Sequence, residues 1–351
     1  MSAILRFGIA GIGNIGHLHA TAIAAAENAE LAAVSGRTAE HVEAAERKLG
    51  VPAYTDWRRL IDDPTIDVIN VCTPSGTHME IAVAAASAGK HVIVEKPLDI
   101  TLARTDAIIR AAADANVKLA CIFPARFKPG ARRLKTAVDA GRLGRLALCD
   151  AYVKWHRSQE YYDTGGWRGT WELDGGGAMM NQSIHHVDLL YHIAGDVRSV
   201  MAYTATRAHT IETEDVVVAS VTFADGALGV IEGSTAAWPG LPGRLEVSGS
   251  DGTVTLDDVV VSRWDLCDGT ETERDAMLNE MKSDGSGSSD PMGIAASGHI
   301  TQIKDFVAAV HEDRTPLIDG AEGRKAVEIV TAIYTSAKEK REVRLPVGGD
   351  G

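Results

Sequence analysis

Three glycines near the amino terminus have the spacing of a dinucleotide-binding turn. Residues 11–16 are GIGNIG, directly after the apolar run Leu5–Ala10 and at the start of a helical pattern. In such a turn the first glycine allows the sharp bend, the second lets the backbone approach a pyrophosphate, and the third lets helix and strand pack closely. The helix N-terminus then faces the phosphates. The alternative is a glycine-rich turn in an unrelated α/β fold. The expected cofactor-binding residues here are Gly11, Gly13, Asn14, Ile15 and Gly16.

The end of the second predicted strand indicates which dinucleotide binds. NAD-specific sites usually place a carboxylate there to hold the ribose 2′-OH, whereas positions 34–38 are VSGRT. Arg37 could bind a 2′-phosphate with its guanidinium, and Ser35 or Thr38 could donate to it. The sequence therefore favours NADP(H). NAD(H) is the alternative if Arg37 only stacks on adenine or faces solvent.

A lysine follows the fourth predicted strand, where positions 95–98 are EKPL. Ligands bind at the carboxyl ends of parallel strands, so we expect Lys96 to point into the ligand crevice. A partly desolvated lysine has a lowered pKa and becomes a usable acid or base. The alternative is a structural role, in which Lys96 only forms an ion pair with Glu95.

A second group with acid–base capacity lies on a predicted helix. Residues 174–188 are glycine-rich and then helical, and Asn181 and His185 are four apart, so they share one helix face. Histidine is the only side chain whose unperturbed pKa lies near neutrality, so His185 is a candidate for proton exchange. Asp188 either holds His185 in one tautomer or pairs within the helix. His186 is expected to face outward or to pack structurally.

Aromatic and polar side chains gather between positions 155 and 173. Aromatic faces stack on the CH surfaces of a pyranose, while Arg, His and Gln reach its hydroxyls. An aromatic core strand beneath a loop is the alternative, and it explains Trp171 well. The candidate substrate-binding residues of this segment are Trp155, His156, Arg157 and Tyr161.

Residues 1–125 alternate apolar strands with Ala-rich helices, as a dinucleotide-binding domain requires. Such βαβ units predict a doubly wound parallel sheet, a Rossmann domain. The expected strands are Leu5–Ala10, Leu31–Ser35, Val68–Thr73, His91–Glu95 and Lys118–Ile122. The expected helices are Gly16–Glu27, Ala39–Leu49, Thr77–Ala88 and Leu102–Ala113.

Residues 126–351 predict an α+β domain with an open, mostly antiparallel sheet, so the whole chain is α/β. This domain is expected to bind substrate and to oligomerise. Its expected strands are Arg198–Ala205, Val216–Phe223, Leu228–Ser234, Leu245–Ser248, Thr253–Leu256 and Val259–Arg263. Its expected helices are Pro129–Ala140, Gly175–Ile193, His299–His311 and Ala321–Lys338, of which those within 299–338 could pack back on the first domain. Residues 283–291 are predicted to be a loop or lid.

Together, GxGxxG, TPSGTH at 73–78, AGKHVIVEKPL at 88–98 and GGGAMMNQSIHHVDLL at 175–190 resemble the Gfo/Idh/MocA oxidoreductase family, which includes inositol and sugar dehydrogenases. The resemblance implies a Rossmann domain followed by an open-faced sheet domain, with the nicotinamide between them. It places the catalytic lysine at Lys96, which hydrogen-bonds the reacting hydroxyl. Further cofactor-binding residues that it implies are Thr73, Pro74, His78, Glu95, Trp167 and Arg168.

Two positions of the family pattern need comment. Arg126 matches a position that lines the cleft, or it forms a structural interdomain ion pair. The pattern has Asp four residues before the His, where this chain has Asn181. An amide can orient a sugar hydroxyl but cannot act as a base, so proton exchange falls to His185 with Lys96, which also stabilises the alkoxide.

The leading hypothesis is therefore an NAD(P)-dependent oxidoreductase that transfers a hydride between nicotinamide and a ring secondary alcohol or ketone of a sugar, glycoside or cyclitol. The WRGTWELDGGG version of the pattern resembles a subset that acts on pyranosides or nucleotide-sugar acids. One alternative is a dinucleotide-dependent sugar-sensing regulatory protein, which need not keep both Lys96 and His185. Another is a reductase of non-sugar carbonyl compounds, whose pocket should be more apolar.

Composition excludes several other partners. The 351 residues carry a net charge of −13, with a pI of about 5.4, which argues against nucleic acid and against an anionic membrane surface. The four cysteines form no CxxC pair, and no targeting or membrane-spanning run is visible, so we expect a cytoplasmic protein with reduced thiols. No metal motif is present. We expect a small-molecule substrate, and a homodimer or homotetramer formed through apolar sheet residues such as Val216, Val218 and Val230.

Overall fold

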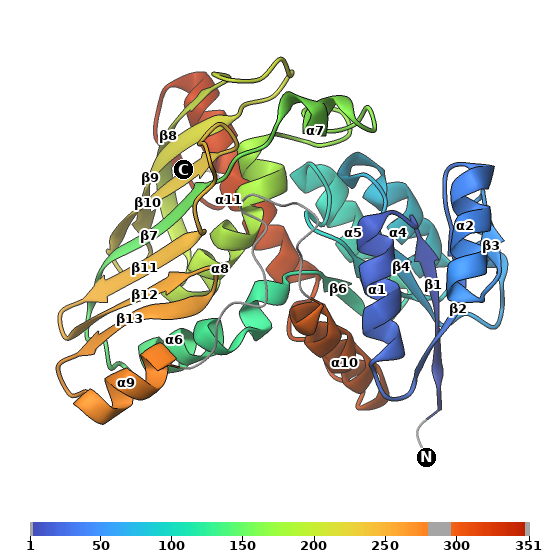
Figure 1. Cartoon of the computed structure of the whole chain (residues 1–351), viewed down its shortest axis with the longest axis horizontal. Helices are drawn as coiled ribbons and strands as arrows, with labels where there is room; N and C mark the ends of the chain where they lie inside the picture. Colours follow the sequence, from blue (N-terminus) through green and yellow to red (C-terminus); the bar gives the residue numbers. More distant parts are fainter. Residues whose placement is uncertain (1–2, 280–295, 348–351) are drawn as a thin grey trace. The chain divides into compact units, whose positions relative to one another are not determined.

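The computed structural model describes residues 3–279 and 296–347 (Figure 1). The chain forms two compact units, which we call unit 1 and unit 2. Unit 1 contains the residues up to 124 together with 296–324. Unit 2 contains 125–295 and the residues from 325 onward, as far as they are described.

Unit 1 is built on a six-stranded parallel sheet with the strand order β3-β2-β1-β4-β5-β6. The chain starts at the centre with β1, moves outward to β3 and returns to β4 on the other side of β1, so the topological switch point lies between β1 and β4. Every residue of β4 is buried, as expected for a strand covered by helices on both faces. The strands are β1 (Leu5–Ala10), β2 (Ala29–Ser35), β3 (Ala53–Tyr54), β4 (Val68–Val71), β5 (His91–Val94) and β6 (Leu119–Cys121).

A helix from the C-terminal part of the chain completes unit 1. Gln302 of this helix, α10 (Ser297–His311), donates to the Cys121 carbonyl at 2.7 Å and accepts from the Phe123 N–H at 3.1 Å. Phe306 joins the buried core around β1, and α10 lies beside α1 (Figure 1). The other helices are α1 (Asn14–Ala24), α2 (Ala39–Leu49), α3 (Arg58–Asp62), η1 (Ser75–Thr77), α4 (His78–Ser87) and α5 (Leu102–Asp114).

Unit 2 is built on an eight-stranded sheet with the order β13-β12-β11-β7-β10-β9-β8-β14. All neighbouring strands are antiparallel except β7 and β10, which are parallel. The strands are β7 (Leu146–Lys154), β8 (Val197–Ala205), β9 (Val216–Phe223), β10 (Leu228–Ser234), β11 (Arg244–Gly249), β12 (Gly252–Asp257), β13 (Val260–Leu266) and β14 (Val343–Arg344).

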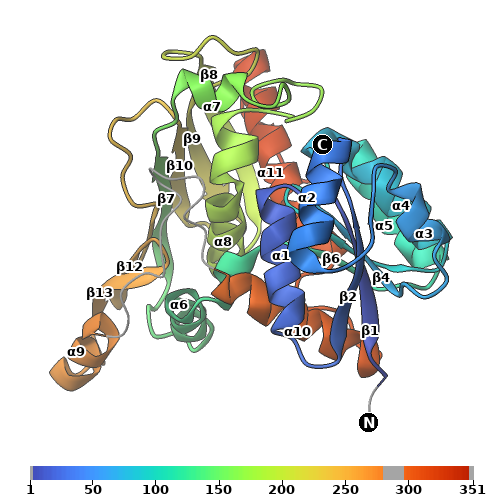
Figure 2. The same ribbon diagram turned by 45° about the vertical axis from the view of Figure 1, so that its right-hand side comes forward.

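Helices cover one face of this sheet. Figure 2 shows α8 and α11 packed on the same side of β7–β10, and no described helix lies over the other side of these strands. The Ser336 hydroxyl of α11 accepts from the Ala202 N–H of β8 at 3.0 Å, which ties α11 to the sheet. The helices are η2 (Pro124–Phe127), α6 (Pro129–Asp139), α7 (Gln159–Asp163), η3 (Ala178–Ser183), α8 (Ile184–Ala194), α9 (Glu271–Asn279) and α11 (Gly320–Glu339).

The predicted fold class is confirmed, and the expected strands and helices of both halves are present with small changes of boundary. The predictions missed β7, a central strand whose apolar residues are interrupted by Asp150. They also missed β3, α3, α7, α9 and β14, which are short or polar. The predicted loop at 283–291 lies outside the described residues. Within the described ranges, no helix is both long and apolar enough to cross a membrane.

The helix predicted over Gly175–Ile193 is present from Ala178 to Ala194, but it is not one regular α-helix. Residues Ala178–Ser183 form a π-helix, η3, and α8 begins only at Ile184. The Ser183 hydroxyl donates to the Ala178 carbonyl, five residues back, at 2.7 Å. A π-helix is wider than an α-helix and is often found at functional sites. Asn181 therefore lies in η3 and His185 in α8, so the four-residue spacing no longer puts both on one α-helical face.

Candidate active site

The three glycines of the first turn occupy positions with different spatial demands. Gly11 has φ +100°, and a Cβ there would lie 2.6 Å from the Cys72 carbonyl oxygen. A Cβ on Gly16 would lie 2.2 Å from the Gly11 carbonyl oxygen. A Cβ on Gly13 would meet no atom within 4 Å, and α1 has no acidic residue in its first turn. The turn therefore has the sharp bend, the close packing and the open approach that a pyrophosphate site needs.

The residues after β2 form the next part of this edge. Ser35 is buried at the end of β2, and its carbonyl accepts from the N–H groups of Gly11 and Ile12 at 3.0 Å. Thr38 caps α2 and accepts from the His41 N–H at 3.4 Å. Arg37 is exposed. Of these side chains, the guanidinium of Arg37 is the cation that a ligand beside β2 could reach.

The TPSGTH segment is tied to the end of β5. His78 is buried, with one ring nitrogen 2.9 Å from the Thr73 carbonyl oxygen and the other 2.9 Å from that of Pro97. The Thr77 hydroxyl donates to Thr73 or to the Pro74 carbonyl, at 2.9 and 2.7 Å. Thr73, Pro74 and His78 therefore lie at the carboxyl edge of the sheet, together with the glycine turn.

Glu95 is a buried carboxylate surrounded by histidines. Its Oε1 is 2.8 Å from His19 Nε2 and 3.6 Å from His299 Nε2. Its Oε2 accepts from the Lys96 N–H at 3.1 Å. Burial by itself would raise the pKa of Glu95, but the hydrogen bond with His19 and the interaction with the nearby His299 outweigh it and hold that pKa well below its ordinary value. The ionised carboxylate thus fixes the backbone at Lys96, whose side chain is half-buried.

Sequence reasoning missed His19 and His299, because their partner is far away in the chain. Asn70 donates to His19 Nδ1 at 2.8 Å and extends the cluster to β4. The ligand atoms of His19, Glu95 and His299 lie within 4.8 Å of one another, near enough to surround an ion. The direct hydrogen bond between His19 and Glu95 already accounts for this arrangement. That the reaction needs no metal remains a prediction.

In unit 2, a second buried carboxylate anchors η3. Glu214 accepts from the N–H groups of Gly177 and Met179 at 3.1 and 2.9 Å, and from the Tyr334 hydroxyl at 2.9 Å. Burial raises the pKa of Glu214 despite these donors. Side chains at Gly176 and Gly177 would collide with Tyr334 and with the Glu214 backbone. The glycine run therefore makes room for the anchor of the helix that leads to His185.

Arg126 and Asp188 form a buried ion pair. Arg126 donates from Nε at 2.8 Å and from Nη2 at 2.6 Å to the two carboxylate oxygens of Asp188. Both residues belong to unit 2, so the ion pair predicted for Arg126 exists but is not interdomain. The ion pair joins η2 to α8, and both carboxylate oxygens of Asp188 accept hydrogen bonds from Arg126.

The predicted aromatic and polar segment forms a compact cluster in unit 2. Arg157 is buried and donates to Gln182, with its guanidinium 5.2 Å from the Trp155 ring. Arg168 lies 4.4 Å over the Tyr161 ring and 5.2 Å from the Trp167 ring. His156 is half-buried and makes an edge contact with the exposed Trp238 at 5.0 Å. Arg157 is thus directed at Gln182, which the sequence analysis had not singled out.

Asn181 and His185 differ in exposure. Asn181 is buried and donates to Asp174, while its side-chain oxygen accepts from Gln182 at 2.8 Å. His185 is half-buried in the first turn of α8. The predicted cofactor residues of unit 1 share one sheet edge, and the candidates of unit 2 surround η3. Lys96 and His185 belong to different units.

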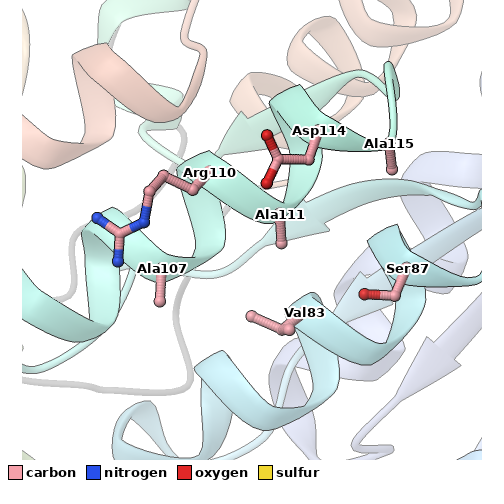
Figure 3. Close-up of a pocket in the computed structure, with 7 residues that line it drawn as sticks. All are labelled: Val83, Ser87, Ala107, Arg110, Ala111, Asp114 and Ala115. Carbon is pink, nitrogen blue, oxygen red and sulfur yellow. The ribbon is translucent and has the colours of Figure 1, made fainter.

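A groove elsewhere on unit 1 contains none of these residues. It lies between α4 and α5, as Figure 3 shows. Small side chains dominate it, with Arg110 and Asp114 as its charged members. It is lined by Val83, Ser87, Ala107, Arg110, Ala111, Asp114 and Ala115.

The chain belongs to the GFO/IDH/MocA oxidoreductase family. Residues 5–123 match its oxidoreductase domain with an NAD-binding Rossmann fold, and residues 131–255 match its C-terminal domain. The chain is 30% identical over 354 residues to a myo-inositol 2-dehydrogenase of Thermotoga maritima, across 97% of this chain and 98% of that protein. It is 28% identical to a levoglucosan dehydrogenase of Pseudarthrobacter phenanthrenivorans, across 86% of each.

A solved structure shares the entire fold. The WlbA dehydrogenase from Bordetella pertussis, crystallised with NADH and UDP-GlcNAcA, has a TM-score of 0.90 and 33% identity, with 99% of both chains covered. The predicted family and the predicted enzyme class are therefore confirmed: the chain is an oxidoreductase with an NAD-binding Rossmann domain.

The structural role predicted for His186 can be tested by pH. Burial lowers its pKa to about 4, and a hydrogen bond with the Gly243 backbone only partly opposes this. A folded-state pKa below the unfolded value of about 6.5 means that His186 supports the fold above pH ~6.5 and that this support is lost as the pH falls toward 4. His186→Gln cannot titrate, so its free energy of unfolding should fall less between pH ~6.5 and 4 than that of the wild type.

Urea unfolding at several pH values measures this difference. His41→Gln, an exposed histidine on α2, is the matched control and should behave like the wild type. Identical pH dependence of His186→Gln and wild type would show that His186 does not carry the effect.

Proposed function

We propose that this oxidoreductase transfers a hydride between nicotinamide and a ring secondary alcohol or ketone of a sugar, glycoside or cyclitol. The observation that carries the proposal is the glycine turn and Lys96 on one edge of the unit 1 sheet, in a chain whose relatives span both units. The names of those relatives, inositol and levoglucosan dehydrogenases, support a polyhydroxylated ring as substrate. The neighbour crystallised with UDP-GlcNAcA supports a pyranose that carries a larger group.

Lys96 and His185 handle the proton in this proposal. The bound nicotinamide supplies the hydride chemistry. Lys96 donates to the reacting oxygen and stabilises the negative charge that develops there. His185 accepts the hydroxyl proton on oxidation and returns it on reduction, a role that an imidazole can fill as acid and as base. Glu95 holds the backbone of Lys96 in place, because its ionised carboxylate accepts from the Lys96 N–H.

Substrate hydroxyls and ring faces meet the cluster around η3. Asn181 orients a hydroxyl, and Trp155, His156 and Tyr161 supply aromatic and polar contacts. Arg157 acts through Gln182, because it is buried and its guanidinium is directed at that amide. Arg126 acts by holding Asp188 and so supports α8. Trp167 and Arg168 stay proposed as cofactor contacts.

The finer cofactor preference is for NADP(H), with NAD(H) as the alternative. No carboxylate stands at positions 34–38, and Arg37 is exposed beside the end of β2. A carboxylate there would repel a 2′-phosphate, whereas a guanidinium pairs with one. The protein is further proposed to act in the cytoplasm, with its cysteines reduced.

A second copy of the chain is proposed to cover the open face of the unit 2 sheet, giving a homodimer or homotetramer. Tyr203 and Val218 are direct neighbours on β8 and β9 and are 70% and 45% exposed. Leu228 and Leu148 are neighbours on β10 and β7 and are 54% and 52% exposed. A row of apolar side chains on adjacent strands is typical of a surface buried by symmetric pairing.

Turnover of a substrate panel tests the function and the cofactor together. Purified protein is mixed with NADP⁺ or NAD⁺ and with glycosides, inositols, sugar acids and UDP-sugars, and reduced nicotinamide is followed by absorbance. We expect turnover of a ring alcohol and a KM for NADP⁺ about tenfold below that for NAD⁺. Arg37→Ala should remove this preference. A clear preference of the wild type for NAD⁺ contradicts the assignment of Arg37.

Two substitutions test the proton-handling residues. Lys96→Met and His185→Ala should each lower kcat by about 10²- to 10⁴-fold, because each removes a group acting on the reacting oxygen. Both should still bind NADPH in a fluorescence titration. Lys48→Met, an exposed lysine on α2, is the control and should keep its kcat. A variant of Lys96 or His185 with near-wild-type kcat would rule out its assigned role.

One charge should disrupt the proposed pairing of sheets. Val218→Lys places an ammonium next to Tyr203, so we expect the dimer to dissociate at least about tenfold more readily in sedimentation or light scattering. Leu317→Lys replaces an equally apolar side chain that is 64% exposed in unit 1, and it should leave the assembly unchanged. A wild-type protein that is monomeric at micromolar concentration refutes the pairing.

A further inference from the structure

A buried chain of hydrogen bonds joins Arg157 to Asp174 through two side-chain amides. Arg157 donates from Nε and Nη2 to Gln182 Oε1 at 3.1 and 2.8 Å. Gln182 Nε2 donates to Asn181 Oδ1 at 2.8 Å. Asn181 Nδ2 then donates to Asp174 Oδ1, and Asp174 Oδ2 accepts from the Gly169 N–H at 2.8 Å. A cation and an anion of unit 2 are thus connected by neutral groups.

The charged ends give this chain a fixed direction. A guanidinium can only donate and an ionised carboxylate can only accept. Each amide therefore turns its oxygen toward Arg157 and its nitrogen toward Asp174. An amide by itself has no such preference, since its two ends are nearly the same shape. Because Asp174 only accepts, it requires Asn181 to turn its Nδ2 toward it and its Oδ1 away from it.

The chain is buried along its whole length. The exposed fractions are 1% for Asp174, 8% for Asn181, 8% for Gln182 and 3% for Arg157. At such burial an opposed pair of donors, or of acceptors, costs far more than it would at the surface. The orientation of Asn181 is therefore strongly determined by its partners.

We propose that Asp174 is a positioning residue for the reaction, because its carboxylate holds the amide of Asn181 in the orientation in which it meets the substrate hydroxyl. This rests on the proposed function, in which Asn181 orients that hydroxyl. It also explains why an amide stands at position 181. An aspartate there, as the family pattern has it, would face the buried carboxylate of Asp174 with no proton between them.

Exchanging the two residues tests this directly. In Asn181→Asp, two acceptors face each other. In Asp174→Asn, the new amide has one oxygen for two donors, the Gly169 N–H and the Asn181 amide nitrogen. In the double variant Asp174→Asn/Asn181→Asp, the new amide accepts from Gly169 and donates to the new carboxylate, which also accepts from Gln182. The exchange thus restores every bond that each single change breaks.

Two measurements are made. The first is kcat and KM from pH 6 to 9 with the substrate found in the panel, and the second is thermal unfolding. Each single variant should lose kcat by about tenfold or more. The double variant should recover part of this loss, because its side chain at position 181 again has fixed partners but is a carboxylate and not an amide. Asp163→Asn removes an exposed carboxylate of α7 and is the control; its kcat should be unchanged.

The pH profile separates positioning from a merely structural role. Two adjacent buried carboxylates in Asn181→Asp can share one proton at low pH, and the pKa of the pair is raised. As the pH rises the proton is lost, so kcat of this variant should fall with pH more steeply than that of the wild type. The double variant should lose this extra dependence. The titratable groups that interact electrostatically with Asp174 include Tyr161, Tyr162 and Tyr334. Glu214 lies behind Tyr334 and Arg157 behind Gln182, and all of these groups are kept.

Three outcomes overturn the proposal. A double variant no better than the poorer single variant shows that Asp174 does not direct position 181. An Asp174→Asn variant with lowered melting temperature but unchanged kcat and KM shows a structural role only. Additive effects of the two changes on unfolding show that the positions are not coupled.

This unfolding cycle needs no substrate. It therefore still decides whether Asp174 orients position 181 if the wild type turns over no sugar and the proposed function fails. A single variant that does not fold, while the double variant does, supports the proposal.

Discussion

A buried carboxylate must be paired, and in unit 1 the pairing of Glu95 brings the carboxyl edge of the sheet together. Glu95 lies at the end of β5, between His19 of α1 and His299 of α10, and Asn70 of β4 supports His19. Its second oxygen holds the backbone of Lys96. The desolvation of this carboxylate is offset only if all of these elements are in place. The lysine proposed to act on substrate is therefore positioned by the same contacts that hold the helices on the sheet.

Unit 2 applies the same constraint to a helix. Glu214 accepts from the first N–H groups of η3, and Asp188 holds Arg126 against α8. Asp174 accepts from Asn181 in the middle of η3. Three carboxylates thus fix this segment: Glu214 at the beginning of η3, Asp174 at its middle, and Asp188 within α8. A π-helix is rare, and in this protein these side chains hold it from outside.

Glycine has two distinct uses in this protein. In the first turn it leaves space that a ligand can fill, because nothing lies within 4 Å of a Cβ built on Gly13. In the run before η3 the space is already filled by Tyr334 and by the Glu214 backbone. The same residue type therefore indicates a binding surface in one unit and close packing in the other. Only the neighbours distinguish the two cases.

The sequence by itself determined the features that depend on local backbone geometry and on periodicity. The glycine spacing at 11–16, the lysine after β5, the alternation of strands and helices and the motifs shared with the family are all properties of short segments, and all could be predicted. The tertiary structure alone decided what each polar side chain pairs with. His299 beside Glu95, Arg126 with Asp188 and Asp174 with Asn181 depend on which surfaces pack together. The π-helix η3 depends on packing too, because the carboxylate that anchors it belongs to Glu214, which lies in a different segment of the chain. Burial makes such pairs obligatory, but it does not tell a single sequence which partner will be there.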